Sequence, residues 1–99
     1  MAKTYVTAVI VAKEGCEALL EKELRKVVDE VRAESGCLRY DLHRSGRGDA
    51  FLFYEIWESP AHLDAHSRAP HMAAMHEATA SLTACPTEVT LWEAVDAAG

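Results

Sequence analysis

The chain has 99 residues, of which 49% are hydrophobic and 26% charged, a composition typical of one globular domain. Its formal net charge of −6 argues against a nucleic-acid-binding face, because binding phosphates requires clustered Lys and Arg. No apolar run approaches the roughly 20 residues that span a bilayer, and the N-terminus lacks the cleavage site of a signal peptide, so we expect a cytoplasmic protein that binds no membrane.

The first half of the chain predicts a strand, a helix and a second strand. Residues 5–12 are rich in β-branched side chains and predict a strand that is apolar on both faces. From about residue 16 to residue 34, an apolar stripe at helical spacing predicts an amphipathic helix, formed by Leu20, Leu24, Val27 and Val31. Gly36 can take the left-handed conformation that ends a helix. Residues 37–44 then alternate, with Leu38, Tyr40 and Leu42 expected on one face of a strand.

The second half repeats this order after a Gly-rich hairpin loop. Residues 50–58 predict a strand whose two faces are both mostly apolar. Ser59 and Pro60 are typical of a helix start, as N-cap and first helical residue, and predict a helix to about residue 67. Pro70 interrupts it, residues 72–82 predict a second helical segment, and residues 88–95 predict the last strand.

The order β-α-β-β-α-β predicts a ferredoxin-like α+β fold, with a four-stranded antiparallel sheet and the helices on one face. Helices on one face leave the other face of the sheet uncovered. That face would carry alternate residues of two apolar strands, and monomers rarely expose such a patch. We therefore expect a homodimer in which two sheets pack face to face.

Several local sequences together carry a resemblance to a known family. They are Glu34-Ser35-Gly36-Cys37-Leu38-Arg39-Tyr40, then Phe53-x-Glu55-x-Trp57, then His66 and Pro70-His71. These residues resemble the antibiotic-biosynthesis monooxygenase (ABM) domain, and the likeness covers residues 5–95. Within that family the chain is most similar to quinol-monooxygenase-like proteins and to isomerases that degrade a phosphorylated autoinducer.

The resemblance implies a dimeric α/β barrel and, for several members, oxygenation without metal or flavin. The activity that the resemblance implies is oxidation by O2 of a small aromatic quinol or phenol, with no cofactor. The haem-degrading branch relies on an Asn early in the first strand, and this chain contains no Asn. Because the same scaffold carries several activities, the fold alone does not select one.

Oxygenation without a cofactor requires an apolar pocket, a base that deprotonates the substrate, and donors that hold the resulting anion. Histidine is suited to the base, since its ordinary pKa of about 6.5 is close to working pH. We therefore predict His66 and His71 as catalytic residues, with Glu55 orienting an imidazole. We predict that the substrate contacts Trp57, Tyr40, Met75, Met72 and His62.

Each of these residues also has a structural alternative. The histidines could be bonded to neighbouring groups in the fold, and Glu55 could pair with Arg39. The aromatic and methionine side chains could belong to the core or to the dimer contact. His62 and His66 are one helical turn apart, as in many metal sites, but a third ligand would have to come from beyond Pro70, so we predict no metal.

Two other functions stay open from the sequence alone. An isomerase of a small phosphorylated ketone would need cationic groups for the phosphate, and four arginines are available: Arg39, Arg44, Arg47 and Arg68. A small-ligand-binding or structural dimer would need no catalytic base. Oxygen consumption separates the oxygenase from the isomerase and from the ligand-binding or structural dimer, because only the oxygenase uses O2.

Overall fold

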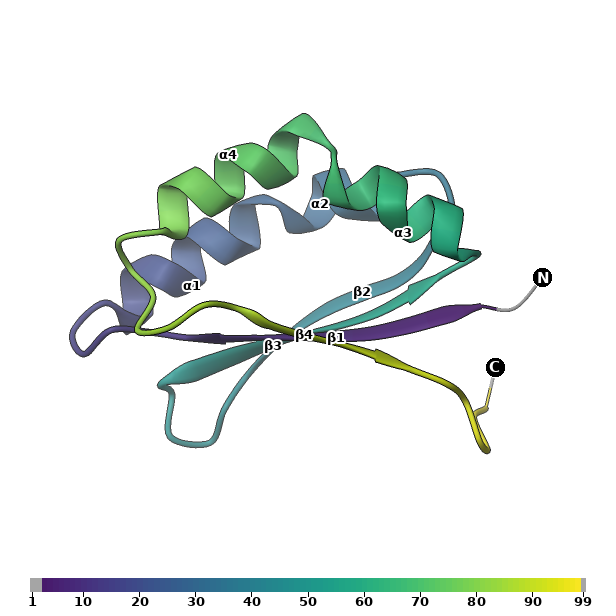
Figure 1. The fold of residues 1–99 in the computed structure, drawn as a ribbon. Helices are drawn as coiled ribbons and strands as arrows, with labels where there is room; N and C mark the ends of the chain where they lie inside the picture. The colour runs from purple at the N-terminus through teal and green to yellow at the C-terminus, as the bar shows by residue number, and fades with distance from the viewer. Residues whose placement is uncertain (1–2, 99) are drawn as a thin grey trace.

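In the computed structural model, which describes residues 3–98, four strands form one antiparallel sheet in the order β2-β3-β1-β4. The elements, in chain order, are β1 (Thr4–Val11), α1 (Glu17–Lys26), α2 (Val28–Arg32), β2 (Cys37–Arg44), β3 (Ala50–Trp57), α3 (Pro60–Ser67), α4 (Pro70–Thr79) and β4 (Glu88–Trp92). All four helices lie on the same face of the sheet, and α1 runs beside α4 (Figure 1). The predicted ferredoxin-like architecture is confirmed.

The core lies between the helices and the inner face of the sheet. Strict alternation along β1 and β3 sends every second side chain inward, and the apolar ones are at most 7% exposed: Val6, Ala8, Ile10, Phe51, Phe53 and Trp57. The predicted helical stripe packs against them, with Leu20, Leu24, Val27 and Val31 at most 3% exposed. Burying this apolar surface is what holds the helices on the sheet.

Four predicted elements differ in detail from the structure. The helical segment predicted over residues 72–82 begins earlier and ends earlier, as α4 over Pro70–Thr79. The first helix is interrupted at Val27, where two β-branched residues with lower helix propensity follow each other, although its buried stripe continues across the break. The last strand ends at Trp92 rather than residue 95, because Trp92 already pairs with Tyr5 near the start of β1. The prediction for Leu38 was wrong. A register shift between Cys37 and Arg39 leaves Leu38 49% exposed, while Tyr40 stays buried.

The turns that place α3 and α4 follow the sequence signals. Ser59 is the N-cap of α3, where its side-chain oxygen accepts a hydrogen bond from the backbone N–H of His62. Pro60 and Pro70 open α3 and α4, where a missing N–H costs nothing. Gly36 has a φ of +77° and lies directly against the imidazole of His62, so the start of β2 and the start of α3 touch.

The opposite surface of the sheet, which we call the outer face, has no helix over it (Figure 1). Its side chains come from alternate positions of β1 and β3 and are half-buried: Tyr5, Thr7, Val9, Val11, Leu52, Tyr54 and Ile56. Trp92 of β4 is 55% exposed and donates its indole N–H to Thr7 Oγ1 at 2.8 Å. No helix among residues 3–98 is long and apolar enough to cross a membrane.

Candidate functional site

A cavity of about 140 Å³ lies between the inner face of the sheet and the two helices that follow Ser59. Its apolar walls come from all the strands except β2 and from α3 and α4, with Val6, Ala8, Ile10, Phe53, Leu63, Met72, Met75 and Val89. Its polar side chains are Tyr40, Glu55, His66, Ser67, His76 and Thr87. A mostly apolar hollow with a few convergent polar groups is the usual form of a small-molecule site.

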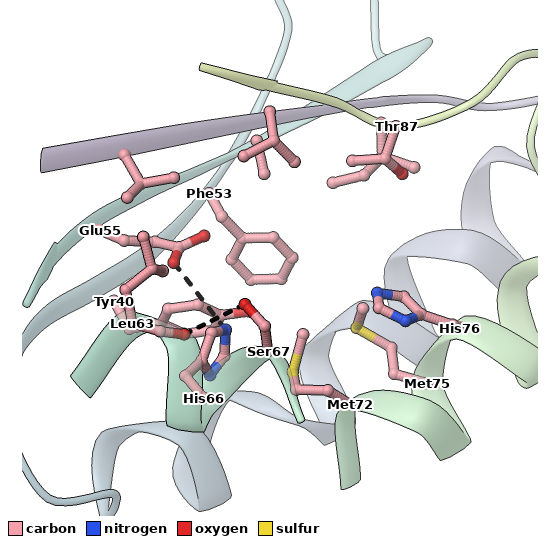
Figure 2. Close-up of a pocket in the computed structure, with 14 residues that line it drawn as sticks. Tyr40, Phe53, Glu55, Leu63, His66, Ser67, Met72, Met75, His76 and Thr87 are labelled. Atoms are coloured by element: carbon pink, nitrogen blue, oxygen red, sulfur yellow. Dashed lines mark hydrogen bonds and ion pairs between the residues drawn. The ribbon is translucent and has the colours of Figure 1, made fainter. Parts of the chain in front are cut away.

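The polar groups of the cavity are gathered at its two ends, with Phe53 between them (Figure 2). At one end, Glu55 and Tyr40 from the sheet approach His66 from α3. At the other end, Met75 and His76 of α4 lie near Thr87, which precedes β4. The first end holds the buried titratable groups and is therefore the candidate for chemistry.

His66 is held between aromatic rings and is only 4% exposed. Its ring centroid lies 4.5 Å from that of Trp57 and 5.7 Å from that of Tyr40, with the Tyr40 ring in an edge-on arrangement. Its Nδ1 atom lies 2.9 Å from Glu34 Oε2. An ionised carboxylate can only accept hydrogen bonds, so this contact places an imidazole proton on Nδ1, and in the neutral ring the free lone pair is on Nε2. Nε2 is the nitrogen on the side of Glu55, 3.9 Å from Oε1 (Figure 2).

Glu34 binds a second histidine with the same oxygen atom. His71 Nε2 lies 2.6 Å from Glu34 Oε2, so one carboxylate oxygen serves both imidazoles. Glu34 was not among the predicted site residues, although it opens the stretch that carried the family resemblance. The sequence places Glu34 two residues before Gly36, and Gly36 lies against the start of α3. Only the tertiary structure shows that the Glu34 carboxylate contacts His66 and His71.

Glu55 is a buried carboxyl group, 4% exposed. Burial raises its pKa, and the nearby charge of Glu34 adds to the rise, whereas the hydrogen bond from Trp57 Nε1 at 3.0 Å and the imidazole of His66 oppose it. Pairing with Arg39, the structural alternative, does not occur: Arg39 lies opposite Ile56 on the outer face and binds Asp41 at 3.3 Å. The same end of the cavity raises the pKa of Tyr40, first by burial and then by the charges of Glu55 and Glu34.

Five of the predicted site residues line the cavity: Tyr40, Glu55, His66, Met72 and Met75. The other three do not. Trp57 lies behind His66 and is fully buried, His62 binds Ser59 Oγ through Nδ1 at 2.7 Å, and His71 lies on the far side of Glu34. These three can therefore act only through the residues that they hold. Ser67 and His76 line the cavity and were not predicted as site residues.

The charge of the cavity wall narrows the range of ligands. The described residues that line it include neither Lys nor Arg, and Glu55 is its one acidic side chain. Among residues 3–98, no three His, Cys, Asp or Glu side chains are grouped so that they could hold a metal ion. The arrangement offers a base, a carboxyl group of raised pKa and an apolar surface for a flat ligand.

Comparisons with known proteins agree with this architecture. Residues 4–78 match the family model described as antibiotic biosynthesis monooxygenase. The structure of Rv0793 from Mycobacterium tuberculosis superposes with a TM-score of 0.92 at 28% identity, over 99% of this chain and 100% of that one. The structure of PA3566 from Pseudomonas aeruginosa gives 0.90 at 29% identity, over 97% of each chain.

Curated relatives carry related names. "Putative monooxygenase Rv0793" is 31% identical over 87 residues, which are 88% of this chain and 82% of the relative. "Probable quinol monooxygenase YgiN" of Escherichia coli is 37% identical over 71 residues, 63% of this chain and 67% of the relative. The match to sll1783 of Synechocystis, at 31% identity, spans 67% of this chain but only 46% of that longer protein. With a family model matched over residues 4–78 and a fold shared along nearly its whole length, this chain belongs to the antibiotic biosynthesis monooxygenase family.

Proposed function

We propose that this protein is a cofactor-independent monooxygenase that oxidises a small aromatic quinol or phenol with O2. The observation that carries the proposal is the geometry of His66: its Nδ1 is 2.9 Å from Glu34, and its Nε2 lies on the side of Glu55 at the polar end of an apolar cavity, where a neutral imidazole would serve as a base. The relatives named as monooxygenases support the reaction class.

The size and charge of the cavity support the substrate class. In another protein, an engineered apolar cavity of about 150 Å³ accepts benzene, so about 140 Å³ suits one aromatic ring, with any substituent extending toward the open side. The phenolic group would lie against His66 and Glu55, with the ring between Phe53 and Met72. A quinol is neutral at working pH, which matches walls without Lys or Arg.

The chemistry needs one base and one oxidant. His66 Nε2 takes the phenolic proton, the O–H electron pair stays on the substrate, and the resulting anion gives one electron to O2. The two radicals combine into a peroxide anion at a ring carbon, and this anion takes the proton back from His66 Nε2 to become a hydroperoxide, which returns His66 to its neutral form. Loss of water from it leaves a hydroxyquinone, so one oxygen atom enters the product, the other becomes water, and the substrate supplies all four electrons. Groups that stabilise the anion, such as the Tyr40 hydroxyl, lower the barrier of the first step.

The isomerase alternative is less well supported. A phosphorylated ketone needs cationic groups around its phosphate. None of the four arginines, Arg47 included, lines the cavity, and Arg39, Arg44 and Arg68 are bound instead to Asp41, Glu21 and Asp64. A ligand-binding protein without turnover would use the same cavity, and it differs in making no product.

The test is oxygen uptake with a panel of single-ring quinols, measured with an electrode and followed by product analysis under ¹⁸O2. We expect one labelled oxygen atom per product, and a loss of roughly 10²–10⁴-fold in kcat on replacing His66 with Ala, the usual contribution of a general base. His43→Gln, a histidine exposed on β2, is the matched control and should keep full activity. No uptake with any quinol would reject the oxygenase, and full activity of the His66 variant would reject the base.

We also propose, as the sequence predicted, that the protein is a homodimer joined through the outer face. Its half-buried apolar side chains on β1 and β3, together with the exposed Trp92, support this arrangement. The cytoplasmic location remains a prediction.

A further inference from the structure

Glu34 connects the buried base to the protein surface. On its inner side lies His66 Nδ1 at 2.9 Å, in a side chain 5% exposed. On its outer side lies His71 Nε2 at 2.6 Å, in a side chain 19% exposed. The other nitrogen of His71, Nδ1, lies 3.8 Å from Glu30 Oε2, and the Glu30 side chain is 63% exposed. A line of titratable groups therefore runs from the cavity to solvent.

The charges of this line can balance only in certain ways. Glu34 carries one negative charge when ionised, which compensates one imidazolium. Two imidazolium rings bonded to the same oxygen atom would lie within a few ångströms of each other and repel strongly. The cluster therefore favours states in which one of the two histidines, and not both, is positively charged.

We propose that His71 is the proton exchanger of the site: it gives up a proton to solvent when His66 takes one from the substrate. Before the reaction, His71 is the imidazolium and His66 is neutral with a free Nε2. When the substrate O–H bond breaks and its proton binds His66 Nε2, the Nδ1–H bond of His71 breaks and that proton passes to water or buffer at the surface. Both hydrogen bonds to Glu34 persist, the summed charge of Glu34 and the two histidines stays at zero, and the charge that remains in the cavity is that of the substrate anion.

This inference rests on the proposed base role of His66, but it assigns His71 a different task. His71 lines no part of the cavity, so it is a positioning and charge-balancing residue rather than a catalytic one. Its advantage is electrostatic: when His66 becomes an imidazolium, the release of a proton from His71 avoids two positively charged rings on the same oxygen atom of Glu34.

Other titratable groups face this cluster from each neighbouring element. Glu30 approaches His71 from α2, and Glu55 approaches His66 from β3. From β2 come the Tyr40 ring and the thiol of Cys37, whose pKa is raised by burial and then by the charges of Glu34 and Glu55. Arg32 of α2 also lies near this cluster: its charge acts to lower the pKa of Cys37, and its Nε–H donates to the Tyr40 carbonyl at 3.1 Å. The positive charge in direct contact with Glu34 is that of the two imidazoles.

The experiment is a pH titration of the whole chain, monitored by NMR of ¹⁵N- and ¹³C-labelled histidine. It is carried out on the wild type, His71→Gln and His71→Ala. Glutamine can still donate an N–H to Glu34 but cannot titrate, so it separates hydrogen bonding from charge. We expect the midpoint of the His66 titration to rise by roughly one pH unit in His71→Gln, because Glu34 then serves one imidazole alone. His43→Gln should leave the His66 titration unchanged.

Kinetics with a quinol give the second readout. We expect His71→Gln to move the acid limb of the kcat/KM profile by the same interval as the NMR midpoint, whereas a purely structural role would lower the rate equally at all pH values. An unchanged His66 midpoint in His71→Gln would overturn the inference. Because the NMR titration needs no substrate, coupling between the histidines without quinol turnover would reject the proposed function alone.

Discussion

Glu55 is a carboxyl group in surroundings that disfavour its ionised form. The residue is 4% exposed, its pKa is raised chiefly by burial, and the indole N–H of Trp57 donates a hydrogen bond to its carboxyl group. A neutral Glu55 can itself donate a hydrogen bond toward the cavity or toward His66 Nε2. Its protonation state therefore affects both the stability of the fold and the polarity of the site.

The raised pKa makes a prediction about stability. Between the unfolded pKa of a glutamate, about 4.3, and the higher folded value, the folded state binds more protons than the unfolded state. Stability from this group is thus complete below the lower value and is lost as pH rises through the folded pKa. Glu55→Gln keeps the acceptor for Trp57 but removes the titration. As pH rises, the free energy of unfolding of this variant should therefore increase relative to that of the wild type, by about 1.4 kcal/mol per unit of pKa shift.

Urea denaturation between pH 4 and pH 9 measures this difference. Glu58→Gln is the matched control, since Glu58 is exposed at the end of the same strand. A gap between Glu55→Gln and wild type that stays constant across the pH range would contradict the assignment of a raised pKa.

The elements around the site are joined by one close backbone approach. Gly36 has a positive φ and lies against the imidazole of His62, at the start of α3. A side chain there would both strain the backbone and displace His62 from its hydrogen bond with Ser59. The start of α3 sets the position of His66 further along the same helix, so this contact reaches the candidate base.

Three glycine variants separate these effects. Gly36→Ala combines strain with a steric clash, Gly48→Ala has a positive φ but open space, and Gly46→Ala has neither. A residue forced into the left-handed region costs about 1–2 kcal/mol, so we expect this loss in Gly48→Ala, a larger one in Gly36→Ala and almost none in Gly46→Ala. Thermal unfolding of the three variants measures these losses of stability, and quinol binding shows whether the site is affected. Equal losses of stability in Gly36→Ala and Gly48→Ala would show that the contact with His62 matters little.

The sequence was most informative where local chemistry decides structure. Period-2 and helical patterns, together with Ser59, Pro60 and Pro70, were enough to predict the four strands and the order of strands and helices, although not the break at Val27, because capping and alternation act within a few residues. The bulge at Leu38 was not predictable, because an extra residue in β2 is recognised only from its pairing with the neighbouring strand β3. The link between Glu34 and the two histidines also depends on contacts across more than thirty residues, which no local pattern encodes.

At the scale of the molecule, the outer face is the feature that the monomer leaves unexplained. Covering its half-buried apolar side chains with a second sheet would stabilise the protein. A standard interface buries about 800 Å² of surface on each partner. The proposed dimer makes Ile56, which lies on this face beside Tyr5, part of the contact.

We predict that Ile56→Lys lowers the mass in solution from dimer to monomer, because an unpaired charge would be buried between the sheets. Sedimentation equilibrium at micromolar concentration measures this. Leu19→Lys is the matched control, since Leu19 is 50% exposed on α1, on the helix side of the sheet. A wild-type protein that sediments as one chain would remove the proposed interface.

The helices and the cavity occupy one face of the sheet, and the outer face is the other. In a pair joined through the outer face, two stacked sheets about 10 Å apart would separate two chambers facing opposite directions. No loop or helix of one subunit would then need to move when the other subunit binds its ligand. Saturation with ligand should accordingly follow a simple hyperbola, each half of the pair filling as though it were alone.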